Sequence, residues 1–100
     1  MILYAVELEM DAALRDEYLA WLRGHVAEML TLPGFIGAEI LQRHEPTAAA
    51  GRTVVAAHYR LRDRAAFDRY LTEHAPRMRA AGLARFGDRV QAARQLLETV

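Results

Sequence analysis

Apolar and polar positions alternate along four stretches of the chain. In residues 2–9, Ile2, Tyr4, Val6 and Leu8 point to one side, and the residues between them point to the other. A period of two predicts a β-strand with one strongly apolar face. The same reasoning predicts strands over residues 35–44, where the alternation is weaker, over 53–61 and over 90–100.

A helical period of apolar residues separates the first two strands. Over residues 12–30, Trp21 and His25 lie beside an apolar stripe that we expect to be buried. We expect Asp11 to cap this helix and Pro33-Gly34 to end it. The stripe consists of Leu14, Tyr18, Leu22, Val26 and Met29 or Leu30.

A proline interrupts the second helical region. Asp63 is placed to cap its first turn, and Pro76 disfavours helical geometry at Ala75. We therefore expect a kink or restart near Pro76, a second helical segment over residues 76–85, and Gly87 just past its end. The expected buried stripe is Ala66, Phe67, Tyr70, Leu71, His74 and Met78.

The element order is β-α-β-β-α-β within a single domain, residues 1–100. Right-handed crossovers then predict an α+β, ferredoxin-like fold, with an antiparallel four-stranded sheet of order 4-1-3-2 and both helices on one face. Within this sheet we expect the first and third strands to be adjacent and to run parallel.

The face of the sheet that lacks helices determines the expected assembly. It mixes polar residues with mostly small apolar ones, and a large open apolar patch is unusual on a monomer. We therefore predict a homodimer whose two sheets pack face to face. The alanines at the centre either leave a small-molecule cavity or only allow close packing. The candidate residues are Leu3, Ala5, Glu7, Val54, Ala56, His58 and Arg60, with Ala92, Arg94 and Leu96 or their neighbours.

Composition narrows the function classes. Thirteen basic residues balance 13 acidic ones, so bulk charge favours neither nucleic acid nor membrane as a partner. Residues 1–50 are net acidic and residues 51–100 net basic. Either the two halves attract each other, within a subunit or across a dimer, or the distribution arises by chance. Cysteine is absent, and no signal peptide or apolar span of ~20 residues is evident. We expect a cytoplasmic protein without a metal site.

Several motifs resemble those of known families. The segment RDRAAFDRYLTEHAP, residues 62–76, resembles the second half of antibiotic-biosynthesis-monooxygenase-like domains. A closer resemblance, over nearly the whole chain, is to a small bacterial family of domains of unknown function. It rests on MILY at residues 1–4, Trp21-Leu22, EHAPR at 73–77 and RFGDR at 85–89. The resemblance implies a dimeric α/β barrel, in a superfamily that includes cofactor-free oxygenases, haem-degrading enzymes, isomerases and ligand-binding regulators.

One group of residues is a candidate for catalysis. Glu7 and either His58 or Arg60 are expected to project from neighbouring strands into the space between subunits. A carboxylate near an imidazole raises its pKa and fixes its tautomer, which suits a general base. Arg60 would then stabilise an oxyanion. The alternative is a buried Glu–His or Glu–Arg pair that satisfies itself, and a one-residue shift in register would place these groups on the helix face.

A second group is a candidate for ligand binding, and comprises Tyr4, Trp21, His25, Tyr59 and His74. Trp21, together with Tyr18, could stack on an aromatic ligand, but aromatic residues at helical spacing are more often core residues. By resemblance to haem-degrading relatives, His74 could bind haem, and the same ambiguity applies to His25. The alternative for His74 is a histidine near the Pro76 break that bonds to the backbone. The arginines at 77, 79, 85 and 89 could hold an anionic group, or could be solvated or paired with acidic residues.

Four functions remain open at this stage. The first is a homodimeric module that binds a small molecule in a pocket between sheet and helices. The second is a cofactor-independent monooxygenase or isomerase with His58 as base. Haem binding and a pure dimerisation scaffold are the others. The sequence contains no phosphate-binding loop, zinc-protease motif or nucleophile elbow.

Overall fold

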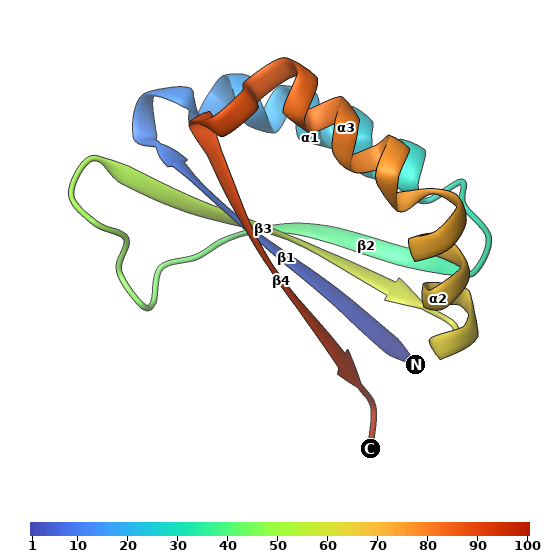
Figure 1. Ribbon diagram of the computed structural model, residues 1–100. Coiled ribbons are helices and arrows are strands. Elements are labelled where there is room, and N and C mark those ends of the chain that lie inside the picture. Colours follow the sequence, from blue (N-terminus) through green and yellow to red (C-terminus); the bar gives the residue numbers. More distant parts are fainter.

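The computed structural model describes all 100 residues (Figure 1). The strands are β1 (Ile2–Asp11), β2 (Phe35–Gln42), β3 (Arg52–Leu61) and β4 (Val90–Glu98). The helices are α1 (Arg15–Met29), α2 (Arg64–Glu73) and α3 (Ala75–Phe86). Single 3-10 turns, Ala12–Leu14 and Gly87–Arg89, precede α1 and β4. No helix is long and apolar enough to span a membrane.

The four strands form one sheet in the order β2-β3-β1-β4, which confirms the ferredoxin-like fold. Each neighbouring pair is antiparallel. The expectation that the first and third strands run parallel is therefore wrong. Because α1 crosses between β1 and β2, these two strands share a direction; β3 follows β2 through a hairpin connection and runs against both.

All three helices cover one side of the sheet, which we call the helix-facing side (Figure 1). This side carries the buried residues of the two central strands. They are the even-numbered residues of β1, from Ile2 to Met10, and the odd-numbered residues of β3, from Val55 to Leu61. An aromatic cluster packs between this side of the sheet and α2. It includes Tyr4, Phe35, Tyr59, Phe67 and Tyr70.

The two predicted helix caps differ in outcome. The Asp63 carboxylate accepts a hydrogen bond from the Ala66 backbone N–H at 2.9 Å, which confirms that cap. The prediction that Asp11 caps the first helix is wrong, because Asp11 ends β1 and its side chain makes no cap hydrogen bond. Its carboxylate instead accepts from Arg52 of β3 at 2.9 Å, and α1 begins only after a 3-10 turn.

The predicted breaks lie where expected. α2 ends at Glu73 and α3 begins at Ala75, with Pro76 in its first turn. Gly34, after Pro33, has φ +84°, and a Cβ there would lie 2.3 Å from that of Ala66. This turn therefore requires glycine, both for its backbone conformation and for its close contact with α2. Within the predicted helical stripe, Leu71 is 38% exposed and so does not belong to the core.

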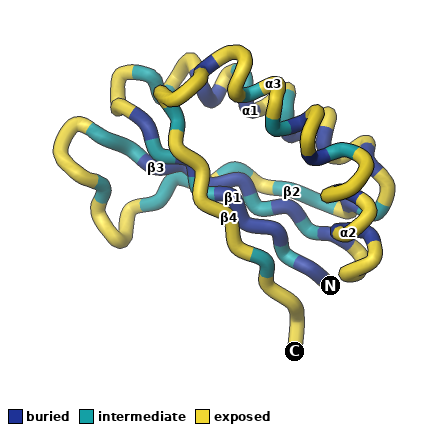
Figure 2. The backbone as a smooth tube through the Cα atoms, in the orientation of Figure 1, coloured by how far each residue is buried: buried dark blue, intermediate teal, exposed yellow.

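The other side of the sheet carries no helix, and we call it the open face. Leu3, Ala5 and Glu7 of β1 lie on it beside Val54, Ala56, His58 and Arg60 of β3, as expected. From β4 it receives Ala93, Gln95 and Leu97, because Ala92, Arg94 and Leu96 pair with the helix-facing residues of β1. β4 is exposed along most of its length (Figure 2).

The open face mixes polar residues with small apolar ones, as the sequence predicts. Ala5, Val54 and Ala56 are already buried within the single chain, although no helix covers them. The same face carries long polar side chains, and three cross-strand ion pairs join them. The pairs are Glu7–Arg43, Glu9–Arg52 and Glu39–Arg60.

Candidate ligand cavity

A cavity of about 360 Å³ lies between the helix-facing side of the sheet and the helices α1 and α3. Most of its lining is hydrophobic. The space exists because small residues occur where larger ones would fill it: Ala57 lies on the floor in β3, Ala92 in β4 and Gly82 in α3.

Aromatic side chains form much of the cavity wall. Tyr4 and Tyr59 are partners across β1 and β3, with ring centroids 5.9 Å apart. On α1, the spacing of Tyr18, Trp21 and His25 places all three on one helix face. The Trp21 indole stacks on the His25 imidazole at 4.6 Å. Flat, rigid walls of this kind suit a planar guest.

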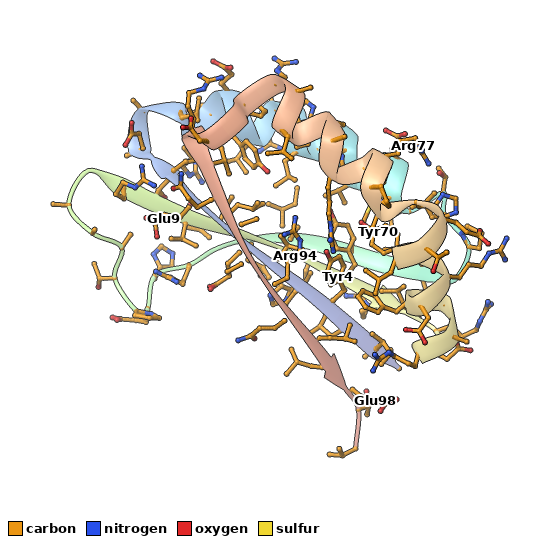
Figure 3. The ribbon with its side chains drawn as sticks, viewed as in Figure 1. Tyr4, Glu9, Tyr70, Arg77, Arg94 and Glu98 are labelled. Atoms are coloured by element: carbon orange, nitrogen blue, oxygen red, sulfur yellow. The ribbon has the colours of Figure 1, made fainter.

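Two arginines reach the same cavity. Arg79 of α3 donates a hydrogen bond from Nη2 to the Tyr4 hydroxyl at 3.2 Å, and its buried Nε has no hydrogen-bond partner. Arg94 lies on β4 at the position that pairs with Val6, and so points to the helix-facing side (Figure 3). Neither arginine forms an ion pair, and no acidic residue lines the cavity. The cavity is therefore electropositive.

Burial favours the neutral forms of three tyrosines and of His25 in the cavity wall. It raises the pKa of Tyr18 to about 12, an effect that Arg94 opposes. Burial also raises the pKa of Tyr70 to about 12 and raises that of Tyr59. Burial lowers the pKa of His25, and the nearby carboxylate of Glu28 opposes this shift. At neutral pH Tyr18, Tyr59 and Tyr70 thus keep their hydroxyl protons, and His25 is an uncharged imidazole.

Four of the five candidate ligand residues line this cavity: Tyr4, Trp21, His25 and Tyr59. The fifth, His74, lies outside it at the junction of α2 and α3. Its Nδ1 is 3.4 Å from Arg77 Nη2, and its Nε2 is 3.8 Å from a Glu73 carboxylate oxygen. Its side chain makes no hydrogen bond to the backbone.

The three candidate catalytic residues lie on the open face, on the opposite side of the sheet from the cavity. His58 pairs with Ala5 and Glu7 with Ala56, so the two are diagonal neighbours. Glu7 forms its ion pair with Arg43 at 3.4 Å, and Arg60 pairs with Glu39 at 3.8 Å. No hydrogen bond or ion pair joins Glu7 to His58 in the single chain.

The sequence did not single out Tyr70 or Arg94 as ligand or catalytic residues. It gave Arg79 only as one of four arginines that could hold an anionic group or be solvated or paired. Arg79 follows the buried Met78, and its side chain folds back over Tyr4. In β4, Ala92 and Leu96 alternate with Ala93 and Leu97, so both faces have similar polarity. Only pairing with β1 decides where Arg94 points. No cluster of three or more His, Asp or Glu side chains suited to a metal ion is present.

The family profile described as a domain of unknown function (DUF4286) matches residues 1–100. The chain belongs to this family. The match confirms the resemblance seen in the sequence motifs at both ends of the chain. No curated protein matches the sequence.

Solved structures of low sequence identity share the fold. HapK from Hahella chejuensis has a TM-score of 0.70 at 18% identity, covering 100% of this chain and 93% of that one. SnoaB, a cofactor-independent oxygenase from Streptomyces nogalater, has a TM-score of 0.64 at 17% identity, covering 99% and 93%. A putative antibiotic biosynthesis monooxygenase from Deinococcus radiodurans has a TM-score of 0.62 at 13% identity, covering 100% and 93%. The TM-scores establish a common fold, that of antibiotic-biosynthesis-monooxygenase-like proteins.

Proposed function

We propose that this protein binds a small planar molecule in the cavity between the sheet and the helices α1 and α3. The observation that carries the proposal is the cavity itself: about 360 Å³, walled by aromatic rings, with a few polar groups directed inward. Small-molecule sites in proteins are usually concave, mostly apolar and of roughly 300–1,000 Å³, with a small number of placed polar groups.

Two measurements test this proposal. Native mass spectrometry of freshly purified protein would reveal a co-purifying molecule as added mass. Trp21, the only tryptophan, lines the cavity, so its fluorescence reports occupancy directly. We expect saturable quenching of Trp21 by a bicyclic aromatic probe such as 2-naphthoate.

A pair of glycine variants makes the test specific to the cavity. A Cβ at Gly82 would lie 3.3 Å from the Trp21 ring, whereas a Cβ at Gly24 of α1 would meet no atom within 4 Å. Gly82→Leu should therefore block the cavity and abolish quenching, while Gly24→Leu should leave it intact. Equal quenching in both variants would place the probe outside the cavity and contradict the proposal.

The second candidate function is cofactor-independent oxygenation in the same cavity. It is supported by the fold shared with SnoaB and by the neutral imidazole of His25 on the cavity wall. A base that removes an acidic C–H proton leaves a carbanion that can reduce O₂. The hydroperoxide formed then loses water to give a ketone, so no outside reductant is consumed.

Anthrone is a suitable probe of this activity, because its acidic methylene is oxidised by O₂ to anthraquinone and water. If His25 is the base, His25→Ala should abolish enzyme-dependent oxygen uptake and His58→Ala should retain it. The reverse result would support the His58 base, with Glu7 and Arg60, on the open face. Absence of uptake in the unaltered protein would leave the binding function alone.

We also propose that the protein forms a homodimer through its open face. Leu3 and Leu97 are paired neighbours there, and Leu41 is 38% exposed at the opposite edge. Acidic and basic side chains alternate across the face in cross-strand pairs. A second copy related by a two-fold axis can therefore cover the leucines and place opposite charges against each other.

A further inference from the structure

We propose that the cavity selects a negatively charged ligand, an aromatic carboxylate or phenolate, and that Arg79 and Arg94 bind its anionic group. This inference rests on the proposed binding function and names the class of molecule that the site accepts. It follows from how the two arginines are placed.

Arg79 lacks the ion-pair partner that its charge requires. Arg79 is partly buried, and a guanidinium withdrawn from water normally has a carboxylate partner, because removing its charge from water without one is costly. Arg79 has only the Tyr4 hydroxyl, at 3.2 Å, and its buried Nε has no partner at all. A neutral hydroxyl is a weaker acceptor than an anion, so a bound carboxylate or phenolate would satisfy this guanidinium better.

Outside the cavity, only Arg23 lacks a partner, and it lies exposed to solvent on α1. Eight of the 13 arginines form ion pairs with Asp or Glu. Arg85 and Arg89 lie against the Phe86 ring, and Arg89 also donates to two backbone carbonyls. The two arginines of the cavity have no carboxylate, although acidic residues are as numerous as basic ones in this chain.

Arg94 provides the second positive charge from the opposite wall. It projects from β4 to the helix-facing side, where Tyr4 and Tyr70 also lie (Figure 3). With Arg79 on α3, the two guanidinium groups flank an aromatic cavity whose lining includes no Asp or Glu. An aromatic ring can therefore enter among Tyr4, Tyr18 and Trp21 while its anionic group meets the arginines.

The test compares two probes of nearly equal shape and different charge. Trp21 quenching is titrated with 2-naphthoate, which is anionic, and with 2-naphthamide, which is neutral. Charge-assisted hydrogen bonds of this kind are each worth about tenfold in affinity or more. We expect 2-naphthoate to bind at least about tenfold tighter, and Arg79→Gln and Arg94→Gln each to remove most of that preference.

Arg77→Gln is the matched control. Arg77 is two residues from Arg79 on the same helix, but it pairs with Glu28 on the exposed surface and points away from the cavity. Its replacement should leave the preference unchanged. Arg94 is exposed, so Arg94→Gln keeps the test decisive even if Arg79→Gln fails to fold.

The outcomes separate this inference from the proposed function. Equal affinity for the two probes, or a preference that survives both cavity variants, overturns the anionic selectivity while leaving the cavity a binding site. An equal loss in Arg77→Gln shows a bulk charge effect and also overturns it. If neither probe quenches Trp21, both the selectivity and the aromatic binding function are contradicted.

Discussion

Single residues decide the chemistry of the cavity side of the sheet. Tyr4, Trp21, His25 and Tyr59 could be named from the sequence, because the β1 and β3 alternation and the α1 stripe are unambiguous. Arg94 could not be named from the sequence, because the residues of β4 that point to its two faces have similar polarity. His58 and Glu7 were correctly placed on one face, but the sequence does not reveal that Arg43 takes the Glu7 carboxylate.

The buried tyrosines predict a loss of stability at high pH. Tyr18 and Tyr70 hold their protons more tightly when folded, with pKa values of about 12 against a usual value near 10. Their stabilising contribution is complete below pH ~10 and is lost as the pH rises towards ~12. We expect tyrosinate absorbance at 295 nm to rise together with loss of the circular dichroism signal.

Tyr18→Phe is the informative variant for this prediction. It removes one of the ionising groups and should move the alkaline unfolding transition to higher pH. Tyrosinate formation near pH ~10 in a chain that stays folded would show that these hydroxyls are not buried.

At the scale of elements, the hydrophobic periodicity and the residues that begin or end helices predict most of the helices and strands. Pro33-Gly34, Asp63, Pro76 and Gly87 act locally, through backbone geometry and a nearby hydrogen bond, so the sequence suffices to predict them. Asp11 shows the limit of that reasoning. Its carboxylate interacts with Arg52, 41 residues away, because strand pairing brings β3 alongside β1.

The two aspartates give a prediction about helix stability. Asp63→Ala removes the acceptor for the Ala66 N–H and should lower the free energy of unfolding by about 1 kcal/mol. Asp11→Ala removes only an exposed ion pair and should have a clearly smaller effect. Urea denaturation of both variants measures the difference, and an equal loss would contradict the assignment of the caps.

At the scale of the whole molecule, the strand order and the one-sided helices follow from element order and crossover handedness. The antiparallel direction of β3 relative to β1 also follows from that topology, so the expected parallel pairing is wrong. The cavity could not be located from the sequence alone, because it depends on how far Ala57, Gly82 and Ala92 hold the layers apart. The assembly depends on surfaces of two chains and stays a prediction.

The proposed homodimer predicts a mass of twice 11.3 kDa by size-exclusion chromatography with light scattering at micromolar concentration. Leu41→Glu should shift the protein towards the monomer by placing a charge on the open face. Leu71→Glu is the matched control, because Leu71 is equally exposed, at 38%, but lies on α2. A monomeric mass for the unaltered protein, or an equal shift in both variants, would contradict pairing through this face.

The central claim is that the functional site lies on the helix-facing side of the sheet. A titration of isotope-labelled protein with 2-naphthoate, followed by NMR chemical shifts, tests it most directly. We predict that the shifts concentrate on the Trp21 indole, on His25 and on Arg79, which line the cavity. Shifts confined to His58 and Arg60 on the open face, or no shifts at saturating probe, would contradict it.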